Sequence, residues 1–174
     1  VALTDEVKST SATAIQELKA LGIKTYMLTG DNAQTAAVVA NEVGIDHYVA
    51  QTLPADKANF VKQLQAEGKK VAMVGDGIND SAALAVADLS VAMGRGSDIA
   101  IDTAMLTLLT SDLLRLPQAI RLSARTVRTI RQNLFWAFFY NVVSVPIAAG
   151  VLYPICGFML SPIIAGAAMA LSSV

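Results

Sequence analysis

The distribution of charge limits the fold of this 174-residue chain more than any other feature. Every Asp, Glu, Lys, Arg and His lies at or before Arg131, and residues 132–174 contain none of them. A bilayer core about 30 Å thick requires roughly 20 apolar helical residues for each crossing. We therefore expect a membrane hairpin with helices over residues 134–152 and 160–174, the second cut short by the end of the chain. A buried helical hairpin of a larger soluble protein is the competing interpretation, and the length and the absence of charge disfavour it.

The charged part of the chain alternates predicted helices with predicted strands. Apolar residues at helical spacing predict the first helix, and short apolar runs bounded by glycines and acids predict the strands. Such alternation is typical of an α/β fold with a parallel sheet and right-handed crossovers. We expect an α/β domain over residues 1–115, a linker helix over 116–131 and the membrane segment over 132–174. The predicted helices cover residues 4–21, 34–43, 53–67 and 81–87, and the predicted strands cover 23–28, 45–49, 71–74 and 89–93.

The third predicted strand runs into the sequence Gly-Asp-Gly-Ile-Asn-Asp at residues 75–80. Ligands and metals of parallel α/β sheets bind outside the carboxyl ends of the strands. Asp76 and Asp80 are therefore candidate ligands of a hard cation such as Mg²⁺, which prefers carboxylate, water and phosphate oxygens. The alternative is an ordinary acidic turn after a strand.

Polar residues also follow the first predicted strand and open the third predicted helix. Thr29 and Asp31 belong to a Thr-Gly-Asp turn, and Lys57 lies in the first turn of a helix. Taken singly, Thr29 and Asp31 are more typical of an ordinary turn, and Lys57 is more typical of a solvated surface lysine. Together with Asp76 and Asp80 they indicate phosphoryl chemistry, in which the hydroxyl and the ammonium bind phosphate oxygens and the carboxylates hold Mg²⁺.

A basic stripe precedes the charge-free segment. Arg121, Arg125 and Arg128 share one helix face, and Arg131 follows. Arginines that lead directly into an apolar span indicate the cytoplasmic side of a membrane. Nucleic-acid binding is the alternative for such a cluster, and the aromatic residues that run on into the apolar segment disfavour it.

The charge-free segment carries polar side chains that are costly in a membrane without partners: Tyr140 and Asn141 in the first predicted span, and Ser172 and Ser173 near the end of the second, where Met169 shares a face with Ser173. The thioether of Met169 is a soft ligand, which favours Cu(I) over a hard dication. Hydrogen bonding between helices, with methionine as a packing residue, is the alternative.

Three motifs of the chain resemble the late phosphorylation-domain motifs of P-type ATPases, within the haloacid dehalogenase superfamily: residues 27–32 (MLTGDN), 53–57 (LPADK) and 73–84 (MVGDGINDSAAL). The resemblance covers essentially the whole chain and implies a Rossmann-like parallel sheet. It implies that Asp76 binds Mg²⁺, that Asn79 and Asp80 order the metal and phosphate site, and that Thr29 and Lys57 contact the phosphoryl group. Gly30 and Asp31 belong to the same Thr-Gly-Asp motif, with Asp31 linking domains or facing the nucleotide.

The membrane motif resembles the copper-exporting heavy-metal subclass of P-type ATPases. Tyr140-Asn141 and Met169-x-x-Ser172-Ser173 are similar to the signatures of its last two membrane helices. The resemblance implies that Tyr140, Asn141, Met169 and Ser173 line a transport path for Cu(I), from which Ag(I) is chemically hard to separate. It implies an integral protein of the plasma (inner) membrane with a cytoplasmic α/β domain, in contact with lipid and without nucleic acid. A copper chaperone is a further partner that the subclass allows.

The chain also departs from the P-type ATPase pattern. It contains no Asp-Lys-Thr-Gly-Thr sequence, which carries the phosphorylated aspartate of the family, and no Cys-Pro-Cys pair. We therefore expect a carboxyl-terminal fragment that is inactive alone, with ATP and Mg²⁺ as cofactors of the longer protein. A membrane-anchored phosphohydrolase of the haloacid dehalogenase type and a truncated regulatory fragment are the alternative functions.

Overall fold

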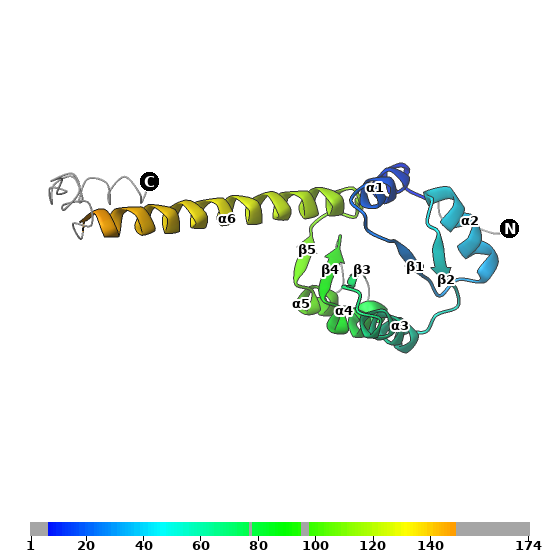
Figure 1. Ribbon diagram of the computed structural model, residues 1–174. Coiled ribbons are helices and arrows are strands. Elements are labelled where there is room, and N and C mark those ends of the chain that lie inside the picture. The colour runs from blue at the N-terminus through cyan, green and yellow to red at the C-terminus, as the bar shows by residue number, and fades with distance from the viewer. Residues whose placement is uncertain (1–6, 77, 95–97, 149–174) are drawn as a thin grey trace. The chain divides into compact units, whose positions relative to one another are not determined.

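The computed structural model describes residues 7–76, 78–94 and 98–148, and the chain divides into two units, Val1–Ile120 and Arg121–Val174. Helices and short strands alternate along the first unit (Figure 1). A 3₁₀ turn, η1 (Ile78–Asp80), precedes α4, and the long helix α6 continues from the first unit into the second. The helices are α1 (Ser9–Ala20), α2 (Ala33–Val43), α3 (Pro54–Ala66), α4 (Ser81–Val86), α5 (Asp98–Thr103) and α6 (Arg115–Ala148), and the strands are β1 (Tyr26–Leu28), β2 (His47–Val49), β3 (Ala72–Gly75), β4 (Leu89–Met93) and β5 (Leu106–Leu108).

All strand pairs are parallel, which confirms the predicted pairing. β1 pairs with β2, with Tyr26 opposite His47, and β3, β4 and β5 follow one another in a three-stranded sheet. The described strands thus form two sheets instead of the single sheet expected, because no ladder of the described residues joins β1 to β3. In each sheet one strand, β1 or β3, leads at its carboxyl end into a loop that carries predicted site residues.

The elements differ from the sequence predictions mainly at their ends. The first helix begins at Ser9, and the part of the prediction over residues 4–6 lies outside the described residues. The predicted strand 23–28 shortens to β1, because its partner β2 offers only three paired residues. Helix α5 and strand β5 were not predicted, since elements of six and three residues give no clear periodicity.

Two apolar clusters form the core of the first unit. One lies between α3, β3 and α4 and includes Val61 and Leu84, each 1% exposed. The other joins α1 to β4 and to the start of α6, through Leu18, Val91 and Leu116. Burial of a leucine or valine side chain stabilises a fold by about 1.5–3 kcal/mol. These clusters therefore fix the helices that carry the candidate site and the first turn of α6.

Polar contacts also attach the start of α6 to α1. The Thr10 hydroxyl donates a hydrogen bond of 2.8 Å to Oδ1 of Asp112, and the same oxygen accepts the Leu114 N–H at 3.1 Å. The Lys8 ammonium donates to the carbonyl oxygen of Ser111 at 2.9 Å. The two bonds to Asp112, first the one from Thr10 and then the one from Leu114, hold the pKa of the Asp112 carboxyl below its ordinary value. The first unit thus holds the chain on both sides of the entry into α6.

Helix α6 joins the predicted linker helix to the first part of the predicted span in one continuous helix, with Pro146 near its end. The rest of that span and the whole second span lie outside the described residues. Among the helices that the structure describes, none combines the length and the apolar character needed to cross a membrane.

Candidate active site

Lys57 and Asp80 form a partly buried ion pair next to the end of β3. Pro54 occupies the first turn of α3, where its missing N–H costs nothing, and the Asp56 carboxylate accepts the Leu53 N–H at 3.0 Å. This start places Lys57 in the first turn of the helix. Its Nζ lies 2.7 Å from Oδ1 of Asp80, and the two side chains are 15% and 14% exposed. The structure therefore brings together two of the predicted site residues that lie far apart in sequence.

Gly75 provides the space in which the Asp80 carboxylate lies. A Cβ atom built on Gly75 would stand 2.7 Å from both Cβ and Oδ2 of Asp80. Real Cβ contacts are not that short, so any larger residue at position 75 would force Asp80 to move. The glycine that ends β3 is therefore a steric requirement of the ion pair, which the sequence alone does not reveal.

Thr29 and Asp31 form a second hydrogen-bonded pair after β1. The Thr29 hydroxyl donates to Oδ2 of Asp31 at 2.7 Å, and the Asp31 N–H donates to the Thr29 Oγ1 at 3.1 Å. Thr52, two residues before α3, donates to the Thr29 carbonyl oxygen from its N–H at 3.0 Å and from its hydroxyl at 2.9 Å. The end of β1 is thus bonded to the segment that leads into the helix of Lys57.

Two residues of this region were missed in the sequence. Thr52 makes the double contact to Thr29, and Gln51 has a positive φ of 54° while its N–H donates to the Asp31 carbonyl at 2.8 Å. A left-handed backbone at a non-glycine residue is uncommon and is found where the surrounding structure requires it. Neither residue belongs to a motif, so no local signal identifies it.

The remaining predicted site residues lie nearby in sequence but make no polar contact within the described part of the chain. Asp76 and Asn79 are exposed, on either side of the undescribed Gly77. Gly30 is exposed, and a Cβ there would meet only the Thr52 carbonyl, at an ordinary 3.8 Å. No hydrogen bond or ion pair of the described residues joins the Thr29–Asp31 pair to the Lys57–Asp80 pair.

The donor set at the end of β3 fits Mg²⁺ in its chemistry. Asp76 and Asp80 present carboxylate oxygens within five residues of each other, which are the ligands that this cation prefers. The described residues contain no group of three His, Cys, Asp or Glu side chains placed to hold a metal. Two carboxylates leave coordination positions for water and for phosphate oxygens, as is usual for Mg²⁺.

Of the four side chains predicted to bind copper, the structure describes two. Tyr140 and Asn141 lie on α6, and the Asn141 side-chain Nδ2 donates to the Ala137 carbonyl of the same helix at 2.9 Å. Met169 and Ser173 lie outside the described residues. The predicted transport path therefore remains a prediction.

A family model described as haloacid dehalogenase-like hydrolase matches residues 1–88, which is just over half of the chain. The chain belongs to the haloacid dehalogenase-like hydrolases. The matched region contains both hydrogen-bonded pairs of the candidate site. This family membership agrees with the parallel α/β fold expected from the sequence.

Curated relatives resemble the chain over its whole length. It is 55% identical to a copper-exporting P-type ATPase of Vibrio cholerae, of which it covers 19%, and 54% identical to copper-transporting ATPase 1 of Rhizobium meliloti, of which it covers 21%. A silver-exporting P-type ATPase of Salmonella typhimurium is 53% identical, and the chain covers 21% of it. The chain therefore spans about a fifth of the length of these relatives. The resemblance to the copper-exporting P-type ATPases is confirmed.

Solved structures agree in fold. A zinc-transporting PIB-type ATPase in its E2.Pi state superposes with a TM-score of 0.82 and 38% identity, over 99% of this chain and 28% of that one. A 3-deoxy-D-manno-octulosonate 8-phosphate phosphatase of Moraxella catarrhalis superposes with a TM-score of 0.58 at 18% identity, over 67% of this chain and 71% of that one. The second match concerns the fold alone. The relatives favour a P-type ATPase over the membrane-anchored phosphohydrolase.

Proposed function

We propose that the chain is part of an ATP-driven Cu(I) exporter, in which phosphoryl chemistry at the end of β3 is coupled to metal transport through the membrane. The Lys57–Asp80 ion pair beside Gly75 carries this proposal. In this proposal the Lys57 ammonium binds phosphate oxygens beside the carboxylate of Asp80, and Asp76 supplies a second carboxylate four residues earlier in the chain. The whole-length similarity to copper-exporting P-type ATPases supports copper as the cargo.

The site residues have separate roles in this proposal. Lys57 and the Thr29 hydroxyl bind phosphoryl oxygens, and Asn79 orders them. Asp76 and Asp80 hold Mg²⁺, which neutralises negative charge on the phosphoryl group. Gly30 and Asp31 form the turn that fixes the Thr29 hydroxyl. ATP and the phosphorylated aspartate are supplied by other parts of the transporter.

The membrane part of the proposal comprises spans over residues 134–152 and 160–174, with the α/β unit on the cytoplasmic side of the plasma membrane. Tyr140, Asn141, Met169 and Ser173 bind the cargo, Cu(I) or the chemically similar Ag(I). A silver exporter among the relatives supports this pairing of ions. A copper chaperone that delivers the ion is a further proposed partner.

An Asp76→Asn substitution tests the catalytic part of the proposal. In a transporter that carries this chain together with its nucleotide-binding and phosphorylated parts, we expect the loss of one Mg²⁺ carboxylate to reduce copper-stimulated ATPase activity by at least about 100-fold. The measurement is ATP hydrolysis with and without copper, together with the amount of phosphoenzyme. The matched control is Asp46→Asn, because Asp46 is an exposed carboxylate that pairs with Lys19 away from the site.

Near-normal copper-stimulated activity in Asp76→Asn would overturn the assignment of the catalytic site. Equal losses in Asp76→Asn and Asp46→Asn would indicate a general effect on folding, and would also remove the support for that site.

A further inference from the structure

Three arginines of α6 form a basic row that no acidic residue interrupts. Arg121, Arg125 and Arg128 project within about a quarter of the helix circumference, and Gln132 and Trp136 continue the same row. The last acidic residue of the chain is Asp112, before the helix begins. Arg125 and Arg128 are exposed, and the described residues give neither of them an ion-pair partner. Arg125 and Arg128 therefore carry positive charge that no ion pair of the described residues compensates.

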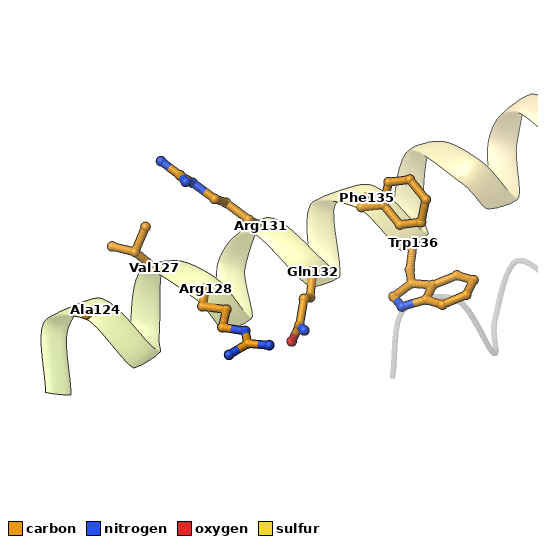
Figure 2. Close-up of a pocket in the computed structure, with 7 residues that line it drawn as sticks. All are labelled: Ala124, Val127, Arg128, Arg131, Gln132, Phe135 and Trp136. Atoms are coloured by element: carbon orange, nitrogen blue, oxygen red, sulfur yellow. The ribbon is translucent and has the colours of Figure 1, made fainter. Parts of the chain in front are cut away.

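A shallow hollow of about 330 Å³ lies where the basic row meets the aromatic residues. Figure 2 shows the Arg128 guanidinium, the Gln132 amide and the Trp136 indole on one side of the helix, with Arg131 and Val127 on the other side. The side chains at positions 128, 132 and 136 follow one another at intervals of four residues, so they are neighbours on the helix surface. The hollow thus has a cationic end, an amide in the middle and an indole at the other end.

The aromatic end is a cluster without an apolar cover in the described part of the chain. The Trp136 ring centroid lies 5.6 Å from that of Phe135 and 5.8 Å from that of Phe139. Trp136 and Phe135 are 63% and 60% exposed. Large exposed apolar groups beside polar ones mark a contact surface, and tryptophan favours the boundary between lipid and water.

A ligand of this surface needs an anionic head and an apolar body. A guanidinium binds a phosphate diester through two N–H groups, the Gln132 amide donates to its oxygens, and the indole packs against the first methylenes of an acyl chain. A nucleic acid would satisfy the arginines but would leave Phe135, Trp136 and the charge-free residues after them facing water. An anionic glycerophospholipid satisfies both ends at once.

We propose that Arg128, Gln132 and Trp136 form a binding site for the headgroup of an anionic glycerophospholipid, such as phosphatidylglycerol. This inference rests only on the membrane part of the proposed function. The charge pattern of the helix by itself indicates only which end faces the cytoplasm. The proposal adds a site that is specific for one class of lipid.

Trp136 is the single tryptophan of the chain, so its fluorescence reports on the site directly. The full chain is placed in phosphatidylcholine bilayers that contain, at equal mole fraction, either brominated phosphatidylglycerol or brominated phosphatidylcholine. We expect brominated phosphatidylglycerol to quench Trp136 more strongly. Arg128→Gln should lower the relative association constant of phosphatidylglycerol about fivefold, and Arg128→Lys should retain part of the preference because it keeps the charge and loses the bidentate geometry.

The matched control is Lys24→Gln, which removes one exposed positive charge from a loop before β1 and should leave the preference unchanged. Equal quenching by the two lipids in the unsubstituted chain would overturn the proposal, as would equal effects of Arg128→Gln and Lys24→Gln. Displacement of phosphatidylglycerol by inorganic phosphate or by duplex DNA at equal concentration would assign the site to a soluble anion instead and also overturn it. The assay contains neither copper nor ATP, so its failure is distinguishable from failure of the transport function.

Discussion

Gly75 is required for a steric reason, because the Asp80 carboxylate occupies the place of its missing side chain. We predict that Gly75→Ala displaces Asp80 from Lys57 and reduces phosphoenzyme turnover of the transporter by at least about tenfold, since the ion pair positions both groups. The measurement is copper-stimulated ATP hydrolysis, with circular dichroism to check that the helices persist. Normal turnover in Gly75→Ala would contradict the role of this ion pair.

Gly44 is the matched control, because it is required for a different reason. It ends α2 in the left-handed conformation with φ 76°, and nothing lies within 4 Å of a Cβ built there. Gly44→Ala should therefore cost about 1 kcal/mol of folding free energy and leave turnover per folded molecule unchanged. The two substitutions separate a loss of function from a loss of stability.

The candidate site was predictable to the extent that its residues lie in local motifs. Lys57 was identified because it lies in the first turn of a helix, and Asp80 because it ends the turn that follows a strand. Parallel α/β sheets bring such positions together at the carboxyl ends of the strands. Thr52 and the contact between Gly75 and Asp80 were not predictable, because they depend on the path of the chain between elements. Sequence patterns report on spacing within an element and not on distances across the fold.

Asp88 connects the end of α3 to the start of β3. Its carboxylate accepts hydrogen bonds from Lys70 at 2.8 Å and from the Val71 N–H and the Gln65 amide at 3.0 Å each. These bonds, that of Lys70 first, hold the pKa of Asp88 well below its usual range. A carboxyl whose pKa is lower in the folded chain stabilises the fold above its unfolded pKa of about 4, and that contribution is lost as the pH falls through the folded pKa.

We therefore predict that the stability of the α/β unit falls more steeply below pH about 4 in the unsubstituted chain than in Asp88→Asn. The measurement is urea unfolding of the chain in mild detergent across that pH range. NMR titration should show that Lys70→Gln raises the pKa of Asp88, because it removes the first cause of the shift. Equal slopes for the two chains, or an unchanged pKa, would contradict this interpretation.

The bond from Thr10 to Asp112 fixes the start of α6 to α1. Thr10→Val removes the donor and keeps the shape, so we predict a local loss of about 1 kcal/mol and faster amide exchange around Leu114. Hydrogen exchange followed by mass spectrometry measures it. Thr126→Val is the matched control, because the Thr126 hydroxyl bonds the Leu122 carbonyl within α6 itself. Similar exchange around Leu114 in both variants would show that the bond does not hold the helix start.

Elements were predictable where they are long or clearly bounded. The strand over residues 89–93 matches β4, and Gly44 and Pro54 mark the end of α2 and the start of α3 as expected. The short β5 was missed because its position depends on pairing with β4 and not on its own three residues. The continuity of α6 across the predicted linker and span follows from the absence of glycine and proline between Pro117 and Pro146.

For the whole transporter, the copper path yields a separate prediction. If the proposed copper path is correct, Met169→Ala removes a soft ligand and should weaken Cu(I) binding by at least about tenfold, and Tyr140→Phe should weaken it less. Equilibrium titration with a Cu(I) chelator measures the affinity and the stoichiometry. Met105→Ala is the matched control, because Met105 is 71% exposed and lies in the α/β unit. Unchanged Cu(I) binding in both Met169→Ala and Tyr140→Phe would indicate that these residues only pack between helices and do not bind copper.

The net charge of −1 conceals a molecule with two oppositely charged halves. All fourteen acidic residues lie at or before Asp112, whereas the charged residues of α6 are all arginines. Near an anionic leaflet the acidic unit is therefore repelled and the basic helix is attracted. Both effects should weaken at high ionic strength, because screening shortens their range to about 8 Å at physiological salt.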